Sequence, residues 1–138
     1  MGLELVCDHI NIRVGSYGNV KLVKSFLIDA IKKYITNSNI FFHDKDELLE
    51  KINQSYEDYT IYENLNLYEY QLKGFECFIN HSDCDGYISS SDACYFVKLC
   101  NKLNDYFDKN DLYFIDNKFY LYDIFYYSSQ TGEDIFFC

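Results

Sequence analysis

Hydrophobic residues alternate with polar ones at the start of the chain, and the parity of the alternation slips once, at Asp8-His9. The apolar positions on either side of the slip are Leu3, Leu5, Cys7, Ile10, Ile12 and Val14. A period of two predicts either one strand with a bulge or a hairpin. After the turn-forming residues 15–19, the apolar period changes to three or four, which predicts a helix over residues 17–36 with Ser16 or Asn19 as its N-cap.

The middle of the chain is predicted to contain one short helix and two strands. Asp44 and Glu47 form an acidic variant of the capping box ahead of a group of apolar residues, which predicts a helix to about residue 54. Residues 55–64 follow as a loop. Over residues 65–80 the Leu, Tyr and Phe positions favour two strands over a helix.

A helical stripe is the main signal in the last third of the chain, and it predicts a helix that ends at about residue 107. The residues of this stripe are Ala93, Phe96, Val97, Cys100, Leu103 and Phe107. Asn117 is the expected cap of a further helix through Tyr127, and Gly132 suits the end of that helix. The short apolar segment Glu133–Cys138 is typical of a strand.

Together these elements predict an α+β fold with a small, mostly antiparallel sheet and three or four helices. The chain has 138 residues and no Gly/Ser-rich linker, so residues 1–138 are expected to form one compact domain. Hydrophobic residues make up 49% of the chain and aromatic residues 20%, which excludes a disordered protein.

The charge balance limits the class of partner. There are 22 acidic and 12 basic side chains, which gives a formal charge of −10. Proteins that bind duplex nucleic acid need clustered Lys and Arg to displace counterions from the phosphates, so that class of partner is excluded. No apolar run approaches the roughly 18 residues of a membrane span, and residues 1–5 do not resemble a signal peptide. We therefore expect a soluble, cytoplasmic protein without membrane contact.

Six cysteines and three histidines supply no recognisable catalytic or zinc motif. No pair of cysteines has the C-x2-C spacing, so we expect reduced thiols, several of them buried. Cys84 beside His81 is the only locally plausible nucleophile and base, and no neighbouring residue is a recognisable orienting partner. The carboxylates are scattered along the chain, so we expect no catalytic residues and no enzyme.

One segment, residues 81–92, can be aligned with the twelve-position calcium loop. The aligned oxygen ligands are Asp83, Asp85, the Tyr87 carbonyl, a water held by Ser89, and Asp92. Gly86 falls at the sharp turn of the loop. The first position is His81, and imidazole is a poor calcium ligand. The last position is an Asp in place of the longer, bidentate Glu.

The same loop also has a purely structural interpretation. Asp83 and Asp85 can form Asx turns, Gly86 can adopt a positive φ, and Ser90 or Ser91 can cap the helix that follows. Calcium or magnesium is therefore an alternative ligand of this chain, and no cofactor is required.

Negative charge is densest after the helical stripe, where carboxylates and aromatic rings are interleaved. We predict that these residues bind a basic protein partner: Asp105, Tyr106, Asp108, Asp111, Tyr113 and Asp116. The alternative is an acidic surface that does no more than keep the protein in solution.

Three short segments resemble a group of small bacterial and phage proteins with an MGL start, an HSDxDG motif and a GE-x-hydrophobic-Phe tail. Here they are Met1-Gly2-Leu3, residues 81–86 and residues 132–137. The chain is also similar to the family called immunity protein seventy, where a GSY turn opens the first helix, as Gly15-Ser16-Tyr17 does here. The resemblance implies a protein that neutralises a partner toxin, and it identifies no catalytic residue. That family usually has Glu and Trp after HSDxDG, where this chain has Tyr87-Ile88.

Three hypotheses follow from the sequence. The first is a non-enzymatic inhibitor of the immunity type that binds a toxin or defence effector through its acidic, aromatic surface. The second is a divalent-cation module built on residues 81–92. The third is a phage counter-defence protein that sequesters a small nucleotide signal by stacking Tyr and Phe on the base. The third requires Lys21, Lys24, Lys32 and Lys33 to gather at one pocket.

Overall fold

The computed structural model describes residues 2–37, 50 and 86–138. Its elements are β1 (Gly2–Cys7), β2 (Ile10–Ser16), α1 (Tyr17–Asn37), β3 (Tyr87–Ile88), α4 (Ser90–Leu103), β4 (Phe114–Ile115), β5 (Lys118–Phe119), α5 (Tyr122–Thr131) and β6 (Ile135–Phe137). The helix predicted near residues 44–54 lies outside the described residues except for Glu50, and the strands predicted over 65–80 lie outside them entirely.

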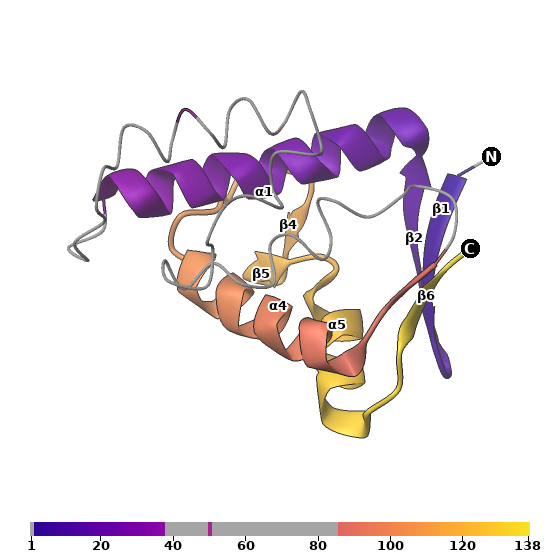
Figure 1. Ribbon diagram of the computed structural model, residues 1–138. Helices are drawn as coiled ribbons and strands as arrows, with labels where there is room; N and C mark the ends of the chain where they lie inside the picture. Colours follow the sequence, from indigo (N-terminus) through magenta and orange to yellow (C-terminus); the bar gives the residue numbers. More distant parts are fainter. Residues whose placement is uncertain (1, 38–49, 51–85) are drawn as a thin grey trace.

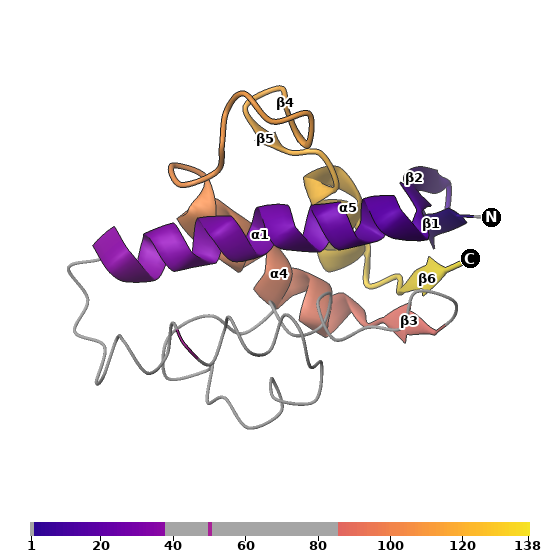
Figure 2. The same cartoon turned by 90° about the horizontal axis from the view of Figure 1, so that it is seen from above.

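The α+β fold class is confirmed. Four strands form an antiparallel sheet in the order β2-β1-β6-β3, and β4 and β5 form a separate two-stranded sheet. Helices α1 and α5 contact β1 and β2, while α4 packs against α5. Figures 1 and 2 show the larger sheet at the N-terminal end of α1.

The first two strands form a hairpin, as one of the two interpretations of the opening alternation predicts. Cys7 pairs with Ile10 across a turn in which Asp8 adopts a left-handed conformation, with φ 51°. A register shift lies between Leu3 and Glu4, which leaves Val14 as an extra residue of β2. A bulge is therefore present too, at a different place from the slip in the alternation.

Helix α1 has 21 residues and matches the prediction of 17–36 to within one residue. Most of the side chains that it buries recur every three or four positions: Val23, Phe26, Leu27, Ala30, Ile31, Tyr34 and Ile35. Lys24 and Ile28 are buried as well. The side chains of residues 16–20 are not described, so the choice of Ser16 or Asn19 as the cap stays a prediction.

Helix α4 ends at Leu103, four residues before the predicted end. Asn104 is its C-cap, and the backbone N–H groups of Tyr106 and Phe107 both donate to the Leu103 carbonyl, at 2.8 and 3.2 Å. This tight turn carries Phe107 back into the core, where it is 4% exposed and stacks on Phe26 at 5.0 Å. The apolar stripe therefore predicts correctly that Phe107 is buried, but it predicts a helix that is longer than the one observed.

The prediction that Asn117 caps a helix is wrong. Asp116 and Asn117 have φ of 55° and 65° and form the turn of the β4–β5 hairpin, because two consecutive left-handed residues match the twist of paired strands. Helix α5 begins after this hairpin, and its N-cap, Leu121, has no side-chain cap bond. Its end is as predicted, at Gly132 in the left-handed conformation.

The core lies between the helices and the inner face of the sheet, and it is rich in aromatic rings. Phe96 and Phe125, from α4 and α5, stack at 4.0 Å and are both fully buried. In β6, Ile135 and Phe137 point into this core, whereas Phe136 is 51% exposed on the opposite face. No helix within residues 2–37 and 86–138 is long and apolar enough to cross a membrane.

Candidate functional site

The structure describes the second half of the predicted calcium loop, from Gly86 onward, while Asp83 and Asp85 lie outside the described residues. Gly86 has φ 107°, as a glycine at a sharp turn requires. Tyr87 belongs to β3, pairs with Phe136 of β6, and its side chain is 58% exposed. Of the five predicted ligands, Tyr87 therefore lies on a strand at the edge of the described sheet.

Ser89, which we predicted to hold a water at the cation, is the N-cap of α4. Its Oγ accepts a hydrogen bond from the Asp92 backbone N–H at 3.2 Å, and its carbonyl accepts one from the Ala93 N–H at 2.9 Å. A serine does cap this helix, as the structural interpretation predicts, but the prediction of Ser90 or Ser91 is wrong, because the cap is Ser89. The Ser90 N–H donates to Asp134 Oδ1 at 3.2 Å, so a carboxylate from the last segment also stabilises this helix end.

The described residues contain no group of three or more His, Cys, Asp or Glu side chains that could hold a metal ion. Asp92 lies in the first turn of α4, where a carboxylate is favourable because of the helix dipole. Cation binding at residues 81–92 stays a prediction that depends on Asp83 and Asp85.

The acidic segment predicted to bind a partner, residues 105–116, leads from the end of α4 into the β4–β5 hairpin. Asp108 Oδ1 accepts from the Asn110 N–H at 3.0 Å, and Asp111 Oδ1 accepts from the Tyr113 N–H at 3.1 Å. These two Asx turns fix the backbone of the segment. Asp105, Asp108 and Asp116 are exposed, and Asp111 is half-buried.

The two aromatic residues of the predicted interface, Tyr106 and Tyr113, differ in how deeply they are buried. Tyr113 is 5% exposed and contacts Phe26 at 5.9 Å and Tyr120 at 5.5 Å, so it belongs to the core. Burial, with a smaller contribution from Asp111, raises its pKa. Tyr106 is half-buried and packs edge-on against Tyr34 at 5.7 Å.

The exposed apolar residues of this segment are Leu112 and Ile115, which are 72% and 50% exposed. The sequence prediction missed both, because they are adjacent to Tyr113 and Phe114 and the chain alone does not say which neighbours point inward. Figure 2 shows the β4–β5 hairpin projecting away from the helices. The segment therefore presents aliphatic side chains beside carboxylates.

A cavity of about 300 Å³ lies between α1 and this acidic segment. It is lined by Tyr106, Asp108 and Asp111 from the segment and by Asp29, Lys32 and Lys33 from α1, with Phe26 and Ala30 between them. Three of the six predicted partner-binding residues are thus brought together with residues of α1.

The four lysines that nucleotide sequestration requires do not gather at this cavity. Lys32 and Lys33 line it, whereas Lys24 is buried (4% exposed) and Lys21 is exposed elsewhere on α1. The two lysines share the cavity with three carboxylates, which would repel phosphate groups. The condition set for the nucleotide hypothesis is therefore not met by the described residues.

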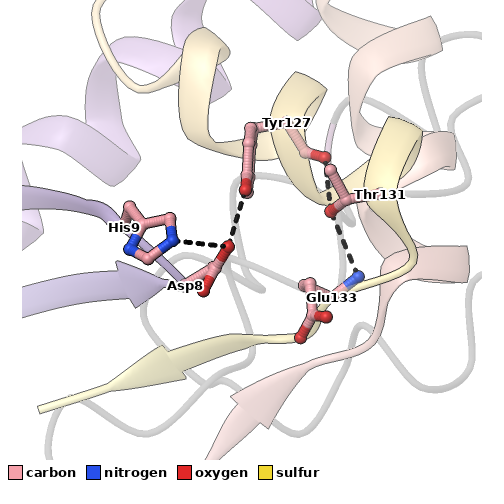
Figure 3. A network of polar contacts seen from close by, with 5 residues as sticks. All are labelled: Asp8, His9, Tyr127, Thr131 and Glu133. Carbon is pink, nitrogen blue, oxygen red and sulfur yellow. Dashed lines mark hydrogen bonds and ion pairs between the residues drawn. The ribbon is translucent and has the colours of Figure 1, made fainter.

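A polar network outside this segment joins the β1–β2 turn to α5 (Figure 3). Asp8 Oδ2 accepts from the Tyr127 hydroxyl at 2.8 Å and lies 3.5 Å from His9 Nε2. The hydrogen bond to Asp8 raises the pKa of Tyr127. The His9 side chain is 89% exposed, so the network lies at the surface of the turn.

The thiol of Cys7, the residue before Asp8, is buried in the protein. Cys7 is fully buried, and its Sγ lies 3.6 Å from the Glu133 carbonyl, which also accepts from the buried Ser128 hydroxyl. Burial and the neighbouring Glu133 and Asp8 raise the pKa of Cys7, which disfavours a reactive thiolate. Cys7 thus ties β1 to the α5–β6 connection, and Asp8 ties the β1–β2 turn to α5. The pair Cys84 and His81 lies outside the described residues.

Comparisons of this chain with protein-family models, with curated proteins and with solved structures found no match.

Proposed function

We propose that this chain is a non-enzymatic binding protein of the immunity or inhibitor type, which blocks a basic partner protein with the acidic segment 105–116. The observation that carries the proposal is the exposure of Leu112 and Ile115, at 72% and 50%, among exposed carboxylates. Protein interfaces commonly combine apolar side chains that are buried on binding with a polar rim that selects the partner.

The folded state of the segment favours tight binding. Its backbone is held by the Asx turns of Asp108 and Asp111 and by the pairing of Phe114 with Phe119 in the β4–β5 hairpin. A surface that is already ordered loses less conformational entropy on binding. The formal charge of −10 adds a long-range attraction toward a basic partner, and this attraction weakens as salt is added.

Affinity capture from a native cell lysate at low salt tests the proposal, with the full chain as bait. The wild-type chain should recover one stoichiometric basic partner, and Leu112→Ser combined with Ile115→Ser should lose it. Each removed contact is worth roughly 1–3 kcal/mol of apolar burial, so the double variant should bind at least about 30-fold more weakly.

A matched control is Leu22→Ser, which removes an aliphatic side chain that is 59% exposed on α1. This variant should capture the partner as the wild type does. The proposal is refuted if no stoichiometric partner appears, or if the double variant retains it in full.

A further inference from the structure

The cavity between α1 and the acidic segment has a size and lining that suit one side chain of a partner. We propose that it receives an arginine side chain of the partner protein, an inference that rests on the proposed function. Its volume of about 300 Å³ lies at the lower end of the range for ligand pockets, so it fits a single extended group better than a whole metabolite. Figure 2 shows the segment that follows α4 leaving on one side of α1 before it rises toward β4.

Carboxylates approach the cavity from both of its walls. Asp29 comes from α1, and Asp108 and Asp111 come from the segment that follows α4. Asp108 and Asp111 each use Oδ1 to accept a backbone N–H, which holds the carboxylate in place and leaves Oδ2 for a further donor. A guanidinium group presents several donors in one plane and can bind two carboxylate oxygens at once.

Aromatic rings line the cavity beside these carboxylates. Tyr106 is half-buried and held by its contact with Tyr34, and Phe26 is held by stacking on Phe107 at 5.0 Å. Both rings are therefore fixed before a ligand enters. A guanidinium plane stacks on such rings, and its aliphatic stem covers apolar surface, so arginine suits this lining better than lysine does.

Lys32 and Lys33 also line the cavity, but they do not neutralise its carboxylates at short range. Within the described ranges, the ion pairs are His9–Asp8 and Lys118–Asp123, and neither includes a cavity residue. The lysine ammonium groups are carried on long flexible stems and can turn toward water, whereas two of the three carboxylates are held by backbone bonds. The fixed charge inside the cavity is consequently negative, in agreement with the negative charge of the whole chain.

The probe for this inference is N-acetyl-arginine amide, titrated into the full-length protein and followed by amide chemical shifts. N-acetyl-citrulline amide, which has nearly the same shape without the charge, is the matched control ligand. We expect saturable shifts that cluster at Asp29, Tyr106, Asp108 and Asp111 with the arginine probe, and none there with the citrulline probe.

The test variant is Asp108→Asn with Asp111→Asn, because Asn keeps the Asx-turn acceptor and removes only the charge. The matched control is Glu4→Gln with Glu133→Gln, which removes two charges outside the cavity. The test variant should weaken binding of the arginine probe by roughly tenfold or more, and the control should leave it unchanged. Shifts scattered over the surface, or equal in both double variants, overturn the inference.

The capture assay separates this inference from the proposed function. If the partner is captured by the wild type and equally well by the Asp108→Asn, Asp111→Asn variant, the arginine site is wrong and the inhibitor proposal stands. If the cavity variant loses the partner and the Glu4→Gln, Glu133→Gln control retains it, both stand. If no variant captures a partner, the proposed function falls, and the assignment of the cavity to a partner's arginine falls with it.

Discussion

Replacement of Ser89 distinguishes a helix cap from a cation ligand. Its Oγ accepts the Asp92 N–H at 3.2 Å, one of the backbone donors that have no partner within α4. Loss of such a cap in Ser89→Ala costs about 1 kcal/mol, and the Asp92 N–H is only half-buried, so water can replace part of the lost bond. For a chain of this length that corresponds to a decrease in Tm of roughly 3–5 °C.

The matched variants are Ser89→Asp and Ser89→Gly, measured by thermal and urea unfolding in buffer that contains a chelator. Asp is an equally good cap, so its free energy of unfolding should match the wild type within a few tenths of a kcal/mol, and Gly should lose only a few tenths. If Ser89→Ala is as stable as the wild type with the chelator and loses stability only when calcium is present, the hydroxyl acts at a cation and the cap argument is wrong.

Four further measurements test the core, the hairpin and the loop. Tyr120→Phe should raise the free energy of unfolding by about 1 kcal/mol, because the buried Tyr120 hydroxyl makes no hydrogen bond to any residue that the structure describes; a lower Tm would contradict this. Burial also raises the pKa of Tyr120, because the folded protein disfavours the ionised phenol. Below about pH 10 this group therefore leaves the free energy of unfolding of the wild type unchanged, and as the pH rises further its ionisation lowers that free energy. Tyr120→Phe should therefore lose less stability than the wild type in alkaline urea melts. Asn117→Ala should cost about 1 kcal/mol because φ is 65° there, whereas Asn117→Gly should be neutral or stabilising, and equal melting curves for the two variants would exclude strain at the turn. Calcium or magnesium at 100 times a site's Kd should add about 2.7 kcal/mol, an effect that Asp83→Asn with Asp85→Asn should abolish; a Tm unchanged by millimolar amounts of both ions removes the cation hypothesis.

Local patterns predicted the described elements well where the backbone alone decides the structure. The opening alternation predicts either a bulged strand or a hairpin, because successive strand side chains point to opposite faces, and the structure has the hairpin. The 3.6-residue period predicts the buried face of α1. Gly132 was identified as the end of α5 because a left-handed residue without a Cβ terminates a helix at little cost. These features depend on neighbours within a few residues.

Features of the candidate site that join distant parts of the chain were not predictable. The hydrophobic pattern of residues 111–116 has no clear period, so it does not predict whether Leu112 or Tyr113 is buried. Tyr113 is the buried one because it packs against Phe26. In the same way, the end of α4 depended on a turn that returns Phe107 to the core.

By itself, the sequence determined the fold class, the amphipathic faces of the helices and the strong negative charge, because composition and short-range period are properties of the chain. Tertiary structure alone brought Asp29 and Lys33 of α1 opposite Asp108 and Asp111, which follow more than seventy residues later. It also assigned Ser89 to the cap of α4 and placed Asp134 at the same helix end. Such long-range neighbours depend on how the helices and sheet bury their apolar faces together, and no local pattern records that choice.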